Sequence, residues 1–195
     1  MSRNETIKVY DARARDYADL VGNEKMDGLD AFLASMPDGA HVLDLGCGPG
    51  NSAVHMVAAG CVVTALDASA EMVALANAIP GVTARQARFD EISGAGLYDG
   101  IWASFSLLHA PKADLPRHLS ALHRAAKPGA RLHLSMKLGD GEGPDRIGRF
   151  YAYYSPSELE DLLASAGFRV QDHFTGADAG LSGDISDWIA FEAYA

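Results

Sequence analysis

The chain contains few cysteines, few basic residues and no long apolar run, and each shortage excludes a class of protein. Its two cysteines, Cys47 and Cys61, lack CxxC spacing, so we expect no disulfide framework, no metal site and a reducing, cytoplasmic compartment. The 16 basic residues stand against 26 acidic ones, and the net charge of -10 disfavours nucleic acid and anionic membranes as partners. No run is long enough to span a bilayer, and residues 1–17 lack the apolar core of a signal peptide.

What the chain does contain is an ordinary globular composition with alternating apolar patterns. Its 195 residues are 48% hydrophobic and 22% charged, which suits one domain over residues 1–195, with residues 1–36 as an N-terminal helical cap. Apolar spacing predicts helices at 6–21, 26–36, 52–59, 70–78, 114–126 and 157–166, and strands at 41–45, 61–66, 82–87, 98–104, 131–136, 169–175 and 188–194. Such alternation predicts an α/β fold with a mostly parallel sheet, helices on both faces and an antiparallel pair at one end.

A glycine-rich loop follows the first predicted strand, in the stretch VLDLGCGPGNS at 42–52. A dinucleotide fingerprint would place its third glycine where this chain has Asn51, and a phosphate-binding P-loop would have a lysine after Gly50. Asp67 ends the second predicted strand, at a distance that suits a carboxylate binding the two hydroxyls of a ribose. The loop therefore predicts a nucleoside ligand that carries no pyrophosphate.

The motifs along the chain resemble those of the class I S-adenosylmethionine-dependent methyltransferases. VLDLGCGPG at 42–50 resembles their first motif, ALDAS at 65–69 their second, YDGIWASFSLLH at 98–109 their fourth, and LHRAAKPGARLHLS at 122–135 the region along the fifth strand. The chain looks most like the small stand-alone enzymes of the tellurite-resistance and quinone-methylation type, over nearly its whole length. The resemblance implies a Rossmann-like, seven-stranded methyltransferase fold. It also implies S-adenosyl-L-methionine as cofactor, S-adenosyl-L-homocysteine as product, and in-line methyl transfer to a small molecule.

The resemblance also implies which residues bind the cofactor. Asp44 would order the first loop, the backbone of that loop would pass beneath the methionine part, and Asp67 would bind the ribose. Many relatives have an acid where this chain has Arg88, and an acid could accept from the adenine amino group where arginine cannot. Met72 and Cys47 are equally compatible with simple packing. The complete set of predicted cofactor residues is Tyr17, Asp44, Gly46, Cys47, Gly48, Asp67, Ala68, Met72, Arg88, Phe89 and Ser104.

Catalysis and acceptor binding are predicted outside these motifs. His109 follows the fourth strand and is the candidate general base for a phenol-like acceptor, although helix capping or packing is equally compatible. In the segment 136–154, Lys137 and Arg149 lie among tyrosines and are expected to bind an anionic or electron-rich acceptor. Arg149 would orient it through its planar fork, and the alternative is a flexible surface excursion.

Two other functions are compatible with the sequence. A nicotinamide-dependent oxidoreductase on a doubly wound sheet is one, and a non-catalytic protein that binds S-adenosylmethionine is the other. For the main hypothesis we expect a monomer or homodimer whose partner is a small-molecule methyl acceptor.

Overall fold

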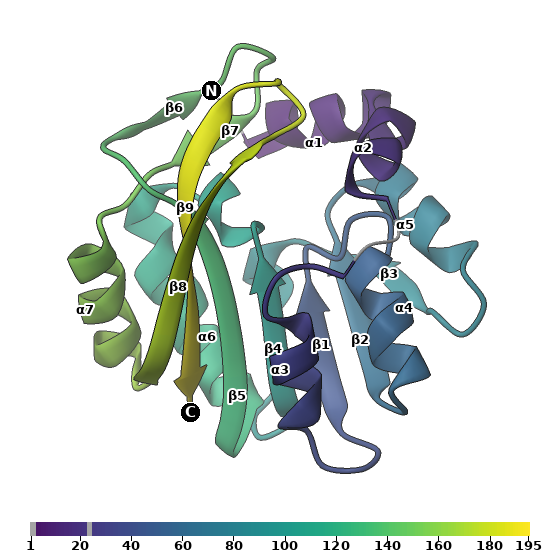
Figure 1. Cartoon of the computed structure of the whole chain (residues 1–195), viewed down its shortest axis with the longest axis vertical. Helices are drawn as coiled ribbons and strands as arrows, with labels where there is room; N and C mark the ends of the chain where they lie inside the picture. Colours follow the sequence, from purple (N-terminus) through teal and green to yellow (C-terminus); the bar gives the residue numbers. More distant parts are fainter. Residues whose placement is uncertain (1–2, 23–24) are drawn as a thin grey trace.

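A computed structural model describes residues 3–22 and 25–195 and is built around a seven-stranded sheet (Figure 1). The strand order is β3-β2-β1-β4-β5-β9-β8, with parallel pairing from β3 to β5 and antiparallel pairing of β9 with both β5 and β8. The strands are β1 (His41–Leu45), β2 (Val62–Asp67), β3 (Ala84–Gln86), β4 (Tyr98–Ser104), β5 (Ala126–Lys137), β8 (Arg169–Ala179) and β9 (Ile185–Tyr194). The predicted α/β fold, with its antiparallel pair at one end, is confirmed.

Helices cover both faces of the sheet because the buried strands present apolar side chains on both sides. Phe32 and Met56, from α3 and α4, pack on Val42 and Trp102. On the opposite face, α6 and α7 pack against a cluster that includes Leu43 of β1. The helices are α1 (Arg3–Ala12), α2 (Ala14–Val21), α3 (Leu29–Ala34), α4 (Asn51–Ala58), α5 (Ala70–Asn77), α6 (Leu115–Ala125) and α7 (Pro156–Ala166), with single 3-10 turns η1 (Phe89–Glu91), η2 (Leu107–His109) and η3 (Lys112–Asp114).

The order of the strands locates the ligand crevice. The chain runs outward from β1 to β2 and β3 and then returns to β4 on the other side of β1, so the direction of the connections reverses between β1 and β4. Ligands of doubly wound sheets bind outside the carboxyl ends of the strands at such a switch point. Figure 1 shows α1 and α2 lying across this end of the sheet, with the β6–β7 hairpin beside α1.

Several predicted elements differ from the structure. The helix predicted at 6–21 is split into α1 and α2, because Arg13 leaves helical geometry at φ -124° and ψ 24°. The helix predicted at 26–36 is reduced to α3: Gly28, at φ 83°, precedes it, and the Ser35 hydroxyl bonds back to the Phe32 carbonyl at 2.6 Å. β3 is shorter than the predicted 82–87, whereas β5, β8 and β9 are longer than predicted.

The segment 136–154, predicted without regular structure, contains a small hairpin. Its strands are β6 (Glu142–Pro144) and β7 (Phe150–Ala152). The Asp145 carboxylate closes the turn by accepting the backbone N–H groups of Ile147 and Arg149, at 3.1 and 2.8 Å. Gly148, at φ 91°, completes the same turn, and its N–H donates to the Asp145 carbonyl at 3.0 Å.

Two further observations concern the described residues alone. None of their helices is both long and apolar enough to cross a membrane. Nor do three or more of their histidine, cysteine and acidic side chains gather where they could hold a metal ion.

Candidate functional site

A cavity lies at the carboxyl ends of β1, β2 and β4, below α1 and α2. All the predicted cofactor residues except Asp44 and Cys47 line it, and so does His109. Asp44 and Cys47 line a smaller adjoining cavity, which shares Tyr17, Gly46, Gly48, Ser104 and Phe105 with the first. The structure thus brings together residues from five separated parts of the sequence.

The glycine loop is held against the end of β2 by its own backbone. The N–H groups of Gly46 and Cys47 both donate to the Leu66 carbonyl, at 2.7 and 2.9 Å. Gly46, at φ 72°, faces Ser106 so closely that a Cβ there would clash with its Cβ. A side chain at Gly46 is therefore excluded both by the left-handed backbone and by lack of space.

Asp67 joins the loop to the start of α5. One carboxylate oxygen accepts the Gly48 N–H at 2.9 Å and the other accepts the Ser69 N–H at 2.8 Å. Burial raises the pKa of this carboxyl, while the hydrogen bonds from backbone N–H groups lower it. Each carboxylate oxygen can accept a second hydrogen bond, so Asp67 can still receive two hydroxyl donors from the cavity.

Asp44 is the more unusual of the two acids because one of its oxygens lacks a partner. The residue is 2% exposed, and its Oδ2 has no hydrogen bond among the described residues. Burial, and then the negative charge of Asp67, raise the pKa of Asp44 to about 7. A buried oxygen without a donor is costly, so this position is suited to a ligand that brings one, such as an ammonium group.

The far end of the cavity has the apolar surface that a nucleobase needs. Met72 is 2% exposed, and with Phe89 and Ala68 it lines the region beyond Asp67. The Arg88 guanidinium instead reaches α1, where it donates to the Asn4 side chain at 3.2 Å. Because position 88 is an arginine and not an acid, its side chain links the wall of the cavity to α1 above it.

His109 belongs to a hydrogen-bonded network that fastens α1 over the cavity. Its Nδ1 donates to the Phe150 carbonyl at 2.7 Å, so its Nε2 accepts the Tyr10 hydroxyl at 2.9 Å. The Arg149 guanidinium also donates to the Tyr10 hydroxyl, at 3.1 Å. Both ring nitrogens of His109 are therefore occupied when α1 is in place.

Arg149 does not have the free guanidinium group that the sequence predicts. It is 1% exposed, and its Nε and Nη2 both donate to the Asp145 carboxylate, at 2.9 and 2.7 Å. The guanidinium also lies over the rings of Tyr10 and Tyr151. These donors are thus engaged within the protein, although Arg149 also lines a second cleft beside the cavity.

A second cleft of about 400 Å³ opens beside the first cavity, between α2, β5 and the β8–β9 hairpin. This volume lies within the usual range of small-molecule sites. Lys137 enters it 4.6 Å from the Tyr151 ring and donates to the Ser186 hydroxyl at 3.2 Å. Phe105 lines both the cavity and this second cleft, and is the one described non-glycine residue with positive φ, at 50°.

Some residues of the site were not in the predicted set. The sequence predicts Tyr10 only as part of the N-terminal helical cap, and nothing in it indicates Asp145 as the partner of Arg149. Phe105 has no local signal, since its strained backbone is visible only in the structure. Ser135, which also lines the second cleft, alternates with His133 within an apolar strand, and this pattern is a signal that could have indicated it.

The protonation of His109 makes stability depend on pH. Burial, followed by the charge of Arg149, lowers the pKa of His109 to about 4 from an ordinary 6.5. Below pH 6.5 the unfolded chain takes up a proton that the folded chain refuses, so the folded state loses stability as pH falls towards 4. Between pH 7 and 4.5 this residue alone should cost about 2–3 kcal/mol.

Urea unfolding of the wild type and His109→Gln at both pH values measures this effect. The stability advantage of the wild type should shrink by that amount at the lower pH. Parallel pH dependence of the two proteins would contradict the prediction.

Comparisons with known proteins agree with this geometry. A family model described as a methyltransferase domain matches residues 14–173. The chain is 30% identical to the O-methyltransferase resE of Aspergillus sclerotiorum, over 77% of this chain and 62% of that protein. It is 32% identical to a trans-aconitate 2-methyltransferase of Methylobacterium nodulans, over 90% of this chain and 65% of that protein. The chain therefore spans less than two thirds of the length of either curated relative.

The fold is also found among solved structures. The 1,6-didemethyltoxoflavin-N1-methyltransferase of Burkholderia thailandensis, solved with bound 1,6-didemethyltoxoflavin and S-adenosylhomocysteine, aligns with a TM-score of 0.74 at 22% identity. The alignment covers 100% of this chain and 90% of that one.

Proposed function

Since this chain belongs to the methyltransferase-domain family, we propose that it transfers a methyl group from S-adenosyl-L-methionine to a small-molecule acceptor. The observation that carries the proposal is the pair of buried acids beside the glycine loop. Asp67 retains acceptor capacity on both oxygens, and Asp44 has an oxygen without a partner. These are the acceptors that two ribose hydroxyls and an ammonium group require.

The other predicted residues have complementary parts in the proposal. The backbone of Gly46, Cys47 and Gly48 supports the amino-acid part of the cofactor, and Met72 with Phe89 contacts the adenine. The remaining predicted contacts are Tyr17, Ala68, Arg88 and Ser104. When bound, S-adenosylmethionine supplies an activated methyl group, so the protein has to align the acceptor with it and exclude water. Helices α1 and α2 form the roof of the cavity. This roof excludes water, because the hydrogen bonds of Tyr10 to His109 and Arg149 hold α1 in place.

His109 is proposed as a residue that positions Tyr10. A catalytic base needs a free lone pair, and the Nε2 lone pair of His109 accepts the Tyr10 hydroxyl. The low pKa of His109, about 4, keeps the ring neutral at physiological pH and so preserves this arrangement.

We propose that the second cleft binds the acceptor, and this acceptor cleft favours a flat molecule with an anionic group. Phe105, Tyr151 and Trp188 provide aromatic walls. Lys137 forms no ion pair among the described residues, and burial followed by the charge of Arg149 lowers its pKa. A carboxylate on the acceptor would supply the missing counter-charge. The name of the trans-aconitate relative, a methyltransferase of a polycarboxylate, supports this class.

The finer expectations belong to the same proposal. We propose one domain over residues 1–195 with residues 1–36 as a cap, although α3 within that range packs on the sheet and residues 1–2 and 23–24 lie outside those described. We also propose a monomer or homodimer in the cytoplasm that does not bind nucleic acid or membranes, which the charge of -10 supports. The likeness to tellurite-resistance and quinone-methylation enzymes stays a prediction about the subtype.

Calorimetry with S-adenosylhomocysteine and transfer of labelled methyl from S-adenosylmethionine test the function. The acceptors are a panel of hydroxybenzoates and dicarboxylic acids. We expect binding and transfer to at least one acceptor. Absence of binding would overturn the proposal, and binding without any transfer would favour the non-catalytic alternative.

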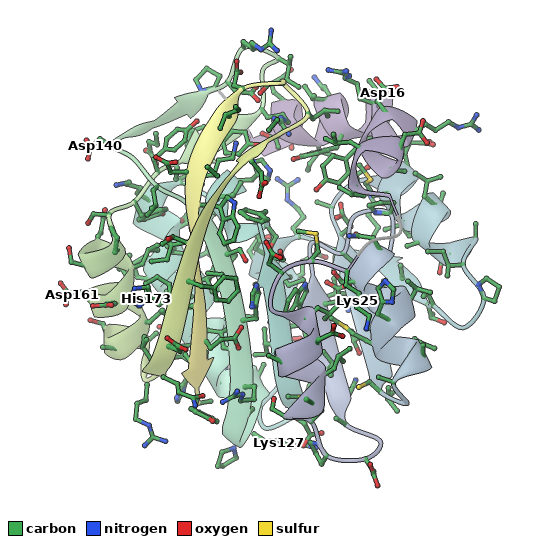
Figure 2. All side chains as sticks on the ribbon, viewed as in Figure 1. Asp16, Lys25, Lys127, Asp140, Asp161 and His173 are labelled. Atoms are coloured by element: carbon green, nitrogen blue, oxygen red, sulfur yellow. The ribbon has the colours of Figure 1, made fainter. Side chains whose placement is uncertain are left out.

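Replacement of Lys137 tests the acceptor class. Lys137→Met should raise the KM of a carboxylate acceptor by roughly 10- to 100-fold, the effect of losing a charged hydrogen bond, and leave the affinity for S-adenosylhomocysteine unchanged. Lys137→Arg should recover part of the loss. Lys127→Met is the matched control, since Lys127 lies at the opposite end of the sheet and pairs with Asp99 (Figure 2). An unchanged KM in Lys137→Met would remove Lys137 from the acceptor site.

A further inference from the structure

Polar side chains form a row across the centre of the sheet, and the proposed function uses only Asp44, at one end of it. Asp44, Trp102, His133 and Glu192 occupy one register on β1, β4, β5 and β9. Residues in register point to the same face of a sheet, so these four side chains lie side by side on the face that α3 covers. Apolar residues usually fill such central positions.

His133 is held by hydrogen bonds on both ring nitrogens. Its Nδ1 lies 2.6 Å from the Glu192 carboxylate, and its Nε2 lies 2.7 Å from the Ser135 hydroxyl. The ring is 0% exposed and stacks on Trp102, with ring centres 3.7 Å apart. This packing fixes the plane of the imidazole.

The partners of His133 also set the direction of the hydrogen bonds. A carboxylate only accepts hydrogen bonds, so the proton of the neutral ring lies on Nδ1, and this N–H donates a hydrogen bond to Glu192. The lone pair of Nε2 is then left to accept the Ser135 hydroxyl proton. The Ser135 oxygen consequently has lone pairs available for a donor from outside. A serine, a histidine and an acid arranged in this order make up a unit able to take up a proton.

The outer end of this unit opens on the acceptor cleft. Ser135 lines that cleft together with Lys137, two residues further along β5. Its register partner on β4 is Ser104, which lines both the cavity and the cleft. Ser135 therefore lies beside the boundary between the two spaces, where an acceptor atom must lie to receive a methyl group.

The strand around Ser135 argues against a nucleophilic role for it. A serine that attacks an ester needs free N–H groups to bind the oxyanion. Ser135 is paired in the sheet with Ser104 on one side and Ala190 on the other, and its carbonyl accepts the Phe105 N–H at 3.2 Å. Proton transfer requires no such donors.

We propose that Ser135, His133 and Glu192 form a proton relay that deprotonates the acceptor, which is accordingly a phenol or alcohol that arrives protonated. This inference rests on the proposed methyltransferase function. The acceptor O–H proton passes to the Ser135 oxygen while the Ser135 proton passes to His133 Nε2. The electron pair left on the acceptor oxygen forms the new bond to the methyl group. Glu192 stabilises the imidazolium, which returns its proton to solvent through Ser135 after the product leaves.

Absorbance of a bound nitrophenol tests the relay without any methyl transfer. The probes are 4-nitrophenol and 3-hydroxy-4-nitrobenzoate, whose phenol and phenolate forms absorb at different wavelengths. Spectra are recorded with and without S-adenosylhomocysteine, at a pH where the free probe is mostly protonated. In the wild type the ratio of phenolate to phenol in the bound probe should rise at least tenfold over its value in solution.

Ser135→Ala should return this ratio to about its solution value, because the path to His133 is cut while the His133–Glu192 pair and Lys137 remain. His173→Gln is the matched control: His173 lies on β8, is exposed, and contacts Phe191 on the opposite face of the sheet (Figure 2). A wild type that binds no probe, or binds it in neutral form, would overturn the relay. An unchanged ratio in Ser135→Ala would do the same. Failure of the proposed function is recognised separately, by absence of S-adenosylhomocysteine binding in calorimetry.

Discussion

Asp67→Ala should weaken the binding of S-adenosylhomocysteine by roughly 10- to 150-fold, which corresponds to about 1.5–3 kcal/mol for hydrogen bonds to a charged group. The variant loses the acceptors for both ribose hydroxyls. It also releases the Gly48 and Ser69 N–H groups, which now donate to the carboxylate at 2.9 and 2.8 Å. The loss of affinity is thus expected to combine missing ligand contacts with a loosened loop.

Two controls separate these causes. Asp67→Asn keeps one acceptor oxygen and should fall between the wild type and Asp67→Ala in calorimetry. Asp161→Ala removes an exposed acid on α7, at the rim of the molecule in Figure 2, and should bind normally. Full affinity in an Asp67→Ala protein with wild-type urea unfolding would exclude Asp67 from the cofactor site.

Arg149→Ala should lower the free energy of unfolding by about 3–5 kcal/mol, the usual cost of removing one partner of a buried ion pair. The side chains of Arg149 and Asp145 are 2% and 10% exposed, so the variant leaves an acid largely buried without its counter-ion. It also removes a donor to the Tyr10 hydroxyl. We expect weaker binding of S-adenosylhomocysteine as well, because the roof over the cavity loses one of its attachments.

Urea unfolding and hydrogen exchange in the β6–β7 hairpin measure this effect. Arg149→Lys should recover little, since one ammonium group cannot reach both Asp145 and Tyr10. Asp145→Asn should be less damaging than Arg149→Ala, because an amide can still accept from the guanidinium. Normal stability of Arg149→Ala, with a change confined to the acceptor KM, would instead support the orienting role that the sequence predicts for Arg149.

The sheet could be predicted from the sequence because its signals are local. Short apolar runs that alternate with helical patterns are sufficient to predict parallel strands, and the glycine loop with Asp67 marks the crevice. The break at Arg13 could not be predicted, because the apolar spacing of α1 continues into α2 across it. The β6–β7 hairpin could not be predicted because its glycine-rich segment has weak strand propensity. The Asp145 side chain closes its turn, and a side-chain contact of this kind has no signal in the apolar pattern.

The roles of the cations were harder to predict than their positions. Arg149 and Lys137 do line one cleft, as their place after the fifth strand indicates. Which of them is available to a ligand depends on Asp145, and a partner four residues away in a turn leaves no periodic signal. His133 and Ser135 lie in a strand that the sequence predicts from its apolar residues, yet their alternation at a period of two places both on one face.

The attachments of α1 have a consequence for how the two ligands influence each other. Thr6 accepts the Phe150 N–H at 2.8 Å, and Tyr10 bonds to His109 and Arg149, so the roof of the cavity and the hairpin beside the acceptor cleft are joined. A molecule that stabilises the hairpin also keeps the roof closed. By thermodynamic reciprocity, the acceptor should then tighten cofactor binding by the same factor as the cofactor tightens acceptor binding. We therefore expect S-adenosylhomocysteine to dissociate only after the methylated product has left. Neither site alone would impose this order of product release.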